Sequence, residues 1–463
     1  MLKTDENGRE YFAYGGDFGE PDHDFDFCCN GMLSSDRKPH PGMYEFRHLV
    51  QPVKVEAADK AAFRFKLTNR REFTDLSDLA GRWELQANGE VIASGKLAGF
   101  EKTAPGESME FELEELKKIS GVTGELFLNF RFELARNEKW GDAGTLLAHD
   151  QIELSEEIAH AAPANRHTPV LSAVRLTDTG KTLLFHTAGL TLSIDRKNGL
   201  GTLCKGKDVI LRKLFECNLF RATTDNDGIR GWTGQEAKPM GLWLAAGLNK
   251  LRQTALDIAV TAQGEGYVIK LDKSYVGKDP AAAVKFIQTV TIHADGKFDF
   301  TQEYFLPENF PSMPRIGVSA FTGAGFEDVK YYGRGPWENY IDRCRSAEVG
   351  LYEMTVRDNF EWGYVLPQEN GNRTGTRWVE LRSADATLRI GSKKPFEFGA
   401  SHYTVSDLFK AFHTNELNER PETVLTLDLA QRGLGTGSCG PQTFSPYTLD
   451  EKHYTFAFSL EVR

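Results

Sequence analysis

The chain has 463 residues, 40% of them hydrophobic and 26% charged, which is ordinary for a globular protein with room for roughly two to four domains of ~100–200 residues. Its net charge of −11 leaves no basic stripe to neutralise phosphates, which argues against a nucleic-acid partner and against an anionic membrane surface. The six cysteines form no CxxC pair, and neither a signal peptide nor an apolar run of ~18 residues is visible, so we expect a cytoplasmic protein.

The N-terminal fifty residues contain a stretch crowded with carboxylates, aromatic residues and glycines, YGGDFGEPDHDFDFCCNGMLSSDRKPHPG. We expect a strand near Phe25–Asn30, then a loop, then a helix in which Met43, Phe46 and Leu49 share one face. One such β/α unit cannot cover both faces of its own strand, because parallel strands need cover on both sides. The two adjacent cysteines of this strand would alternate faces, and we expect them to be buried thiols.

The next hundred residues show the alternation of a half-buried antiparallel sheet. Phe63, Phe65 and Leu67 fall on one face of an expected strand. Asn88 and Gly89 separate two alternating runs, which is the strongest short signal for a hairpin. These features predict a β-sandwich.

A change of pattern from Ser155 to Val170 indicates a linker, because the alternation stops and Ala, Pro and His accumulate there. A longer antiparallel region follows, with hairpin turns at Asn198-Gly199 and Asp295-Gly296 and a final alternating strand over residues 453–462. The sequence therefore predicts a mainly β protein.

Several carboxylates precede Asn30, at the expected carboxyl end of the N-terminal strand, where barrel enzymes keep their active sites. A solvated acidic loop explains the same carboxylates equally simply. Asn30 is the stronger candidate, because a neutral amide can accept from a sugar hydroxyl or give its oxygen to a hard cation such as sodium or magnesium. The carboxylates are Asp17, Glu20, Asp22, Asp24 and Asp26.

Two loops further along the chain are candidates for a binding site. Residues 221–232, RATTDNDGIRGW, begin like a calcium loop at Asp225 but lack its later ligands, so a capped turn leading into a glycine-hinged loop fits better. Trp232 and Trp243 either stack on a sugar there or pack in the core. Residues 432–441, RGLGTGSCGP, lack the GK[ST] ending of a phosphate loop and suit a close-packed loop near a binding cleft.

The sequence shows no complete catalytic motif. It contains no HExxH and no GxSxG segment. A glycosidase needs two carboxyl groups about 5–10 Å apart across the scissile bond, and no segment here pairs a Glu with a convincing pocket at a barrel strand end. The candidate segments look like parts of a cleft without its catalytic pair.

Several of these segments together resemble the large bacterial β-galactosidases of glycoside hydrolase family 2, in the order in which that family carries them. The stretch quoted above resembles the signature at the last strand of the catalytic barrel. The likeness continues in RATTDNDG, YYGRGPWENYIDR, YVLPQENGNRTGTRWVEL, SHYTVSDLFKAFHTNEL and RGLGTGSCGP. These segments are spread over essentially the whole chain, and the sandwich region between them has the family's length and pattern.

The resemblance implies a layout in four parts. Residues 1–52 would be the last strand and helix of a (β/α)8 barrel, 53–156 an immunoglobulin-like β-sandwich, 157–174 a linker, and 175–463 a C-terminal β-supersandwich similar to galactose mutarotases. Family members carry further domains and most of the barrel before this point, so Met1 is expected to be an internal methionine taken as a start.

The missing barrel strands have two consequences. In this family one Glu is the acid/base and another is the nucleophile of a retaining double displacement, with a magnesium ion near the acid. Their segments precede this chain, so no residue here inherits those roles and no magnesium ligand lies in it. We also expect Tyr11–Val50 to leave apolar faces uncovered, and therefore to be mobile or prone to aggregate.

The family's substrate-binding positions can be carried over. The Phe27 carbonyl and the Asn30 side chain match positions that hold a sodium (or potassium) ion touching the sugar 6-hydroxyl, and the Phe27 ring matches one that moves with a substrate loop. Gly228 matches the hinge of that loop. Cys439, or Phe444 one gap away, stands where the family places a Trp on the aglycone side.

We therefore expect the C-terminal portion of a cytoplasmic β-galactosidase that acts on lactose-type substrates. This portion is expected to be inactive alone and to contribute to hydrolysis only together with the rest of the enzyme, which is expected to be a homo-oligomer. A non-catalytic carbohydrate-binding module built on residues 175–463 is the alternative. A sugar epimerase would need a His and a carboxylate to converge, but His402 and His413 lie in a segment whose pattern indicates ordinary packing.

Overall fold

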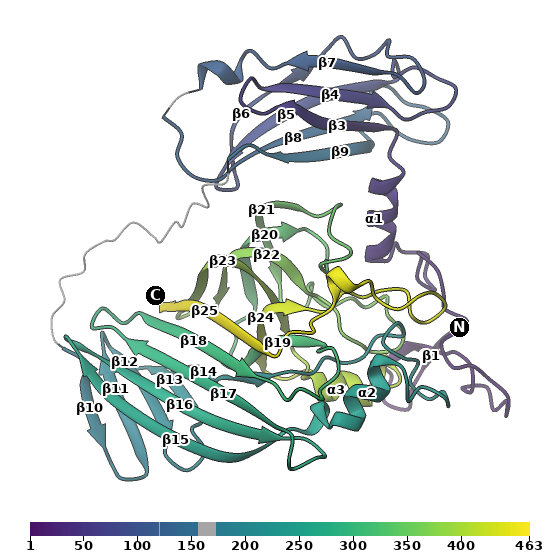
Figure 1. Ribbon diagram of the computed structural model, residues 1–463. Coiled ribbons are helices and arrows are strands. Elements are labelled where there is room, and N and C mark those ends of the chain that lie inside the picture. The colour runs from purple at the N-terminus through teal and green to yellow at the C-terminus, as the bar shows by residue number, and fades with distance from the viewer. Residues whose placement is uncertain (120, 156–172) are drawn as a thin grey trace. The chain divides into compact units, whose positions relative to one another are not determined.

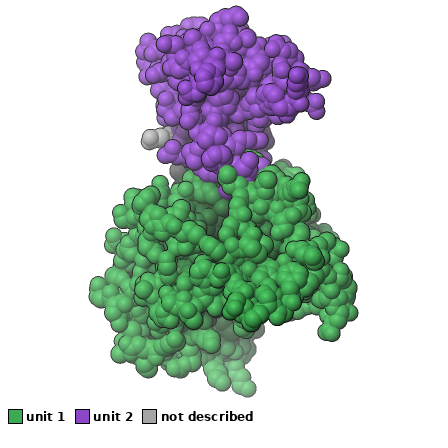
Figure 2. Space-filling view, turned by 90° about the vertical axis from the view of Figure 1, so that its right-hand side faces the viewer, with its two compact units in different colours: residues 1–41, 165–344, 352–463 green, residues 42–164, 345–351 purple. Residues whose placement is uncertain are grey.

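The computed structural model describes residues 1–119, 121–155 and 173–463. The chain divides into two compact units, which Figure 2 shows in different colours. One unit comprises Met1–Pro41, Asn165–Cys344 and Tyr352–Arg463, and the other comprises Gly42–Ala164 and Arg345–Leu351. The expected linker at 157–174 lies almost entirely outside the described residues.

The smaller unit contains a β-sandwich of two antiparallel sheets, as the sequence predicts (Figure 1). One sheet has the strand order β3-β4-β7 and the other has the order β6-β5-β8-β9. The strands are β3 Val53–Asp59, β4 Arg64–Asn69, β5 Leu79–Ala87, β6 Glu90–Leu97, β7 Ser108–Glu112, β8 Leu126–Leu134 and β9 Leu146–Glu153. The predicted hairpin is β5-β6, and Asn88 and Gly89 between its strands both have the positive φ that a tight hairpin turn requires.

The sandwich core is built from alternate residues of these strands. Phe65 and Leu67 of β4 are fully buried, and the Phe65 ring meets Phe130 of β8 edge-on with 5.3 Å between centroids. Phe63 packs half-buried at the edge of the same cluster. The predicted shared strand face is confirmed for Phe65 and Leu67, whereas Phe63 precedes the strand in a turn, with a φ of 52°.

A buried ion-pair network lies in the same unit. Glu348 accepts from Arg131 Nη1 at 2.7 Å and pairs with His149 Nδ1 at 2.8 Å. Burial raises the pKa of Glu348, but the hydrogen bonds from His149 and Arg131 outweigh it and bring the pKa to about 2. His48 lies 4.8 Å from His149 between ring centroids, and burial together with that neighbour lowers the pKa of His48 to about 4.

The predicted N-terminal helix is present as α1, Pro41–Leu49, but its apolar face is only partly covered, since of that face Met43 alone is half-buried. Phe46 and Leu49 remain 45% and 46% exposed, whereas Glu45 is buried and accepts from the backbone N–H groups of Arg345 and Ser346. In a complete barrel a neighbouring element covers such a face, and the described residues supply none.

The larger unit is dominated by one antiparallel sheet of sixteen strands (Figure 1). Its main path runs β10-β11-β12-β13-β14-β19-β24-β23-β25-β18-β17-β16-β15, while β20 pairs with β21 and β22, and β22 also pairs with β23. The strands are β10 Arg175–Asp178, β11 Thr182–Thr187, β12 Leu190–Asp195, β13 Gly201–Lys205, β14 Asp208–Asn218, β15 Arg252–Gln263, β16 Gly266–Val276, β17 Ala283–Ile292, β18 Phe298–Phe305, β19 Arg315–Ala324, β20 Asp328–Gly335, β21 Glu348–Thr355, β22 Arg373–Arg382, β23 Thr387–Ser401, β24 Glu422–Gln431 and β25 His453–Val462. The predicted hairpins β12-β13 and β17-β18 and the final strand β25 are confirmed.

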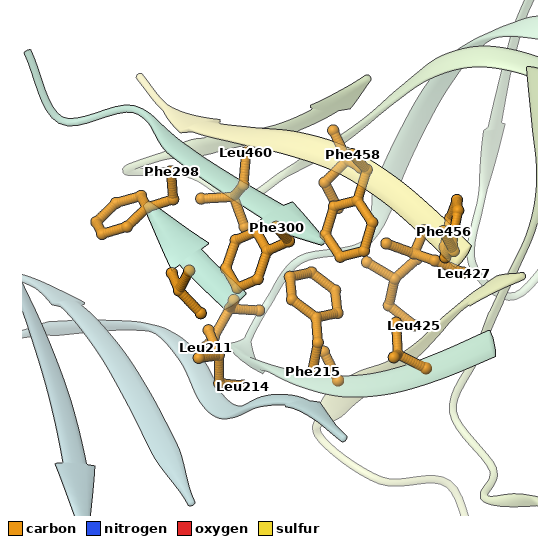
Figure 3. Packing of buried hydrophobic residues seen from close by; sticks show 14 of the residues in the cluster. Leu211, Leu214, Phe215, Phe298, Phe300, Leu425, Leu427, Phe456, Phe458 and Leu460 are labelled. Atoms are coloured by element: carbon orange, nitrogen blue, oxygen red, sulfur yellow. The ribbon is translucent and has the colours of Figure 1, made fainter. Parts of the chain in front are cut away.

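The sheet folds over an aromatic core that Figure 3 shows from close by. Phe215 of β14 meets Phe300 of β18 and Phe458 of β25 at centroid distances of 5.2 and 4.8 Å, and Phe300 stacks on Phe458 at 5.0 Å. All three side chains are at most 4% exposed. Each comes from the inward-facing set of an alternating strand, which is why the alternation in the sequence predicts them as core.

Two short helices lie in the connections of this unit. Helix α2 spans Pro239–Ala246, and helix α3 spans Val405–Lys410. Thr404 begins α3 with a capping box, because its side chain accepts from Asp407 N–H while the Asp407 carboxylate accepts from Thr404 N–H. Helix α3 and the residues after it form the surface on which the N-terminal segment rests.

The expected strand near Phe25–Asn30 is wrong, because the chain forms successive turns there. A single strand would leave its backbone groups unpaired, and the described residues place no neighbouring strand beside it. The chain bends instead, so that Cys29 N–H donates to the Asp26 carbonyl at 2.7 Å and Phe25 takes a φ of 54°. Cys28 is exposed and Cys29 is half-buried, so the expectation of two buried thiols is also wrong.

The first fifty residues nevertheless have a defined course. A small hairpin pairs β1, Leu2–Thr4, with β2, Glu10–Phe12. Large apolar side chains are exposed along this stretch, as expected of a barrel segment without its neighbours. They are Met1, Leu2, Phe18, Met32, Leu33, Phe46, Leu49 and Val50.

Candidate functional site

His413 anchors the N-terminal segment to the large β unit. Its ring stacks on Tyr14 at 4.5 Å between centroids, its Nε2 pairs with Asp17 Oδ2 at 2.8 Å, and its Nδ1 pairs with Glu416 Oε1 at 3.1 Å. The Tyr14 hydroxyl donates to the Phe412 carbonyl, and Tyr14 is only 3% exposed. The turn that carries Phe27 and Asn30 is therefore held on this unit by contacts outside the turn itself.

Phe27 lies against the glycine-hinged loop. Its ring centroid is 5.2 Å from that of Trp232, and both side chains are half-buried. Two residues earlier, the Phe25 ring packs on Gly231, where an added Cβ would come within 2.7 Å of the ring. Gly231 also has a φ of 85°, so both the close approach and the backbone conformation require glycine.

The two residues proposed to bind a cation lie together. Asn30 Nδ2 donates to the Phe27 carbonyl oxygen at 2.7 Å, and Asn30 is exposed. The oxygen and nitrogen of an amide are assigned from their neighbours, and a half-turn places Oδ1 beside that carbonyl. Two oxygens would then face one point, which suits two positions in the oxygen shell of a hard cation. These residues fit part of a sodium site.

The DNDG turn is fixed by a buried ion pair. Arg221 donates to Asp227 through Nε at 3.0 Å and Nη2 at 2.7 Å, and neither side chain is more than 1% exposed. Asp227 also accepts from Thr224 N–H at 3.0 Å. Both oxygens of the Asp227 carboxylate already accept hydrogen bonds from Arg221 or Thr224. At Asp227 the structure therefore has the capped turn that the sequence favours over a calcium loop. Gly228 follows with a φ of 147°, a backbone conformation that favours glycine.

Asn226 joins this turn to the C-terminal glycine-rich loop. Its Oδ1 accepts from Ser438 N–H at 3.2 Å and Ser438 Oγ at 2.8 Å, while its Nδ2 donates to the Gly435 carbonyl at 2.9 Å. Lys238 Nζ donates to the Gly437 carbonyl at 2.7 Å. Loop 432–441 is therefore close-packed on loop 221–238, as its composition predicts.

The expected aromatic position has two candidates, one on this loop and one just after it. Cys439 is exposed immediately after the clamped Ser438. Phe444 is 67% exposed at the entrance to the turn that follows. An exposed aromatic ring such as that of Phe444 can stack on the face of a sugar, whereas the thiol of Cys439 offers no such flat apolar surface.

A cluster of buried charges lies beneath the Phe27 turn. Arg230 donates through Nη1 to the carbonyls of Leu408, Phe409 and Ala411 at 3.1, 2.6 and 3.1 Å. Burial raises the pKa of Asp26, and burial together with the charge of Asp26 raises that of Asp225 to about 7. The Arg230 charge opposes both shifts, so the three groups act as one electrostatic unit.

The remaining candidates have structural roles. Trp243 is fully buried and its Nε1 donates to the Ser312 carbonyl at 2.7 Å, so the core alternative holds for it. His402 Nε2 pairs with Glu327 Oε2 at 2.8 Å, and both ring nitrogens of His413 are already paired. Each histidine therefore contacts a carboxylate, which the prediction of ordinary packing did not anticipate. These contacts hold separate chain segments together.

Sequence reasoning missed Asn226, Arg230 and His413 as organising residues. Asn226 was conspicuous only as a possible ligand, and its partners lie more than two hundred residues away in the chain. Arg230 reaches carbonyls of the segment around α3, and His413 reaches Asp17 across 396 residues. No local spacing signals such contacts.

No group of three or more His, Cys, Asp and Glu side chains in residues 1–119, 121–155 and 173–463 could hold a metal ion. Every helix within those ranges is too short or too polar to cross a membrane.

Comparison with known families gives three matches along the chain. The model of the beta galactosidase small chain matches residues 186–460, that of beta-galactosidase domain 4 matches residues 65–155, and that of the glycosyl hydrolases family 2 TIM barrel domain matches residues 1–55. The first covers more than half of the chain.

Curated relatives match almost the whole chain. A beta-galactosidase of Actinobacillus pleuropneumoniae is 29% identical over 456 residues, which are 98% of this chain and 43% of the relative. Beta-galactosidases of Vibrio cholerae and Priestia megaterium are 29% and 28% identical over 100% of this chain, and 44% and 43% of their own lengths are covered. The chain therefore spans less than half the length of these relatives. A galactose 1-epimerase from Lactobacillus acidophilus aligns at 9% identity with a TM-score of 0.35, covering 63% of this chain and 98% of its own, a likeness too weak to carry an argument.

Proposed function

Because this chain belongs to the β-galactosidase small-chain family and carries the end of a glycoside hydrolase family 2 barrel domain, we propose that it is the C-terminal portion of an enzyme that hydrolyses terminal β-D-galactose residues with retention. Its part in that reaction is to form one wall of the sugar site and the loop that closes on it. The acid/base and the nucleophile belong to polypeptide outside these 463 residues.

The observation that carries this proposal is the meeting of three distant segments at one loop. Phe27 reaches Trp232 by ring contact, and Asn226 clamps Ser438 beside Cys439. A wall made of aromatic faces and amide groups suits a neutral sugar, since rings pack on its C–H faces while amides bond its hydroxyls. Gly228 lies between the two contacts and would let the intervening loop move when sugar binds.

Within this wall we assign Phe27 and Asn30 to a sodium (or potassium) ion. The closeness of the Asn30 amide to the Phe27 carbonyl supports the assignment, because the amide, once turned, would present its oxygen to the same ion as that carbonyl. The ion would supply a positive charge to which a sugar hydroxyl oxygen can bind. Two protein oxygens do not fill a cation shell, so the other ligands come from outside this pair.

On the aglycone side we assign Cys439 to the position at the tip of the clamped loop and Phe444 to the aromatic surface beside it. The substrate class is lactose-type β-galactosides, and the complete enzyme is a cytoplasmic homo-oligomer that carries a magnesium ion near its acid. The six cysteines, none of them in a disulfide in the structure, are compatible with a reducing compartment.

The experiment uses this chain joined to the N-terminal portion that its longer relatives carry. Its hydrolysis of a chromogenic β-galactoside should fall in kcat/KM by at least tenfold in Phe27→Ala and in Asn30→Ala. Phe18→Ala is the matched control, because Phe18 is an exposed ring of the same segment. Wild-type rates in both site variants would contradict the assigned wall.

A further inference from the structure

Cys28 and Cys29 are adjacent in the chain, yet their thiols lie on the same side of the turn that follows Asp26. The two Sγ atoms are 3.9 Å apart, Cys28 is exposed and Cys29 is half-buried. In a strand the two side chains would point to opposite faces. The bend of the backbone that replaces the expected strand is what turns them toward each other.

We propose that Cys28 and Cys29 form a vicinal dithiol site that binds a trivalent arsenical through both sulfurs. The pair is disfavoured as a disulfide, because α-carbons joined by a trans peptide lie ~3.8 Å apart, below the ~4.4–6.8 Å that disulfides need. The Cys28–Cys29 peptide is not among the cis bonds of the chain. The sulfurs would also have to close from 3.9 Å to ~2.05 Å.

The separation instead suits a single atom bridging the two sulfurs. A tetrahedral thiolate site with bonds of ~2.3 Å holds its sulfurs ~3.8 Å apart, so the 3.9 Å found here is in the range that one bridging atom spans. Trivalent arsenic is pyramidal with narrower bond angles, so the two sulfurs draw closer together when it binds. Zinc would need four donors, and within the described residues no third His, Cys, Asp or Glu joins the pair. A trivalent arsenic atom that carries its own organic substituent needs only two more bonds, which the two thiols supply.

The surroundings hold the two thiols in place. Cys29 N–H donates to the Asp26 carbonyl at 2.7 Å, Cys28 Sγ contacts the Phe25 carbonyl at 3.7 Å, and Ser35 Oγ contacts Cys29 Sγ at 3.9 Å. Burial and the neighbouring Cys28 raise the pKa of the Cys29 thiol. The Cys29 thiol therefore carries its proton at neutral pH, and chelation must remove it.

The reaction with phenylarsine oxide balances without an oxidant. Two S–As bonds form, the arsenic–oxygen bond breaks, and the oxygen leaves with the two thiol protons as one water molecule. Arsenic stays trivalent, and the product is a nine-membered chelate ring closed through the Cys28–Cys29 backbone. A chelate of this kind exchanges with another dithiol but resists a monothiol, which can offer only one sulfur at a time.

The test titrates the reduced full chain with phenylarsine oxide and follows intact mass and the number of thiols that react with a chromogenic disulfide. We expect one arsenical per chain, loss of two reactive thiols, release by 2,3-dimercaptopropanol, and no release by the same concentration of glutathione. Cys28→Ser and Cys29→Ser should each abolish this adduct, whereas Cys439→Ser, which removes another exposed cysteine, should retain it.

Retention of the glutathione-resistant adduct in both single variants would overturn the proposal, as would its loss in Cys439→Ser. Circular dichroism of each variant checks that the fold is intact. Should Cys29→Ser fold poorly, Cys28→Ser at the exposed position decides alone, because one missing sulfur is enough to prevent chelation.

Discussion

Replacing Asp227 by asparagine is expected to destabilise the large β unit strongly, because it leaves a buried guanidinium without its counter-ion. Arg221 and Asp227 are 0% and 1% exposed and share two hydrogen bonds, of 2.7 and 3.0 Å. Asparagine has nearly the same shape but no charge, and it replaces one acceptor with a donor that faces the arginine.

The expected cost follows from what remains around Arg221. Breaking a buried ion pair from one side costs about 3–5 kcal/mol. Arg221 keeps its hydrogen bonds to the carbonyls of Arg432 and Gly433 at 2.6 and 3.3 Å, which stabilise the cation partly. We therefore expect the low end, about 3 kcal/mol, or roughly a hundredfold in the folding equilibrium.

The assay is urea unfolding of the full chain followed by tryptophan fluorescence, since Trp243 lies 5.6 Å from the Arg221 guanidinium and reports on this region. The matched control is Asp225→Asn, two residues earlier on the same turn. Because burial and Asp26 raise the pKa of Asp225 to about 7, that carboxyl is already largely protonated at pH 6, and its replacement should cost less than about 1 kcal/mol there. Equal losses in the two variants, or a loss below about 1 kcal/mol in Asp227→Asn, would refute the reasoning.

Three further outcomes are expected. His413→Ala removes the anchor of the N-terminal segment, so amide exchange over residues 11–17 should rise about tenfold; unchanged protection would show that other contacts hold the segment. Gly231→Ala should lower the free energy of unfolding by about 1–3 kcal/mol, because the new Cβ meets the Phe25 ring. Gly234 has a similar positive φ but open space around it, so Gly234→Ala should lower the free energy of unfolding by less. Equal losses in the two variants would leave only backbone strain as the cause. The pKa of Glu348 is about 2, below its ordinary value of 4.5, so its contribution to the stability of the sandwich is present above pH 4.5 and lost as pH falls through 2. Glu348→Gln should abolish that part of the dependence of unfolding free energy on acid pH. An unchanged acid profile in this variant would argue that the ion pair contributes nothing.

The local pattern of the sequence predicts most of the β structure because strand and turn signals are short-range. Asn88-Gly89 and Asp295-Gly296 each connect strands within a few residues, and both hairpins form where they are expected. The inward residues of β4 and β25 follow from alternation alone. Such elements need no information from distant parts of the chain.

The expectation fails where a segment depends on partners elsewhere. Phe25–Asn30 has the composition of a barrel strand, but a strand requires neighbours for its backbone hydrogen bonds, and the described residues place none there. The contacts of Asn226 and His413 span 212 and 396 residues, so the candidate site could be named residue by residue but its assembly could not be predicted. The family resemblance identified the segments, and only the fold brings them to one loop.

The most direct test is whether any carboxylate of this chain acts as a glycosidase nucleophile. Purified chain is incubated with a 2-deoxy-2-fluoro-β-galactoside bearing a good leaving group, which traps the covalent intermediate of a retaining enzyme. We expect an unchanged intact mass, because the proposed function assigns the nucleophile to the part of the enzyme that this chain does not include. A stoichiometric glycosyl adduct on a glutamate or aspartate of this chain would contradict the proposal that it forms only the wall of the site.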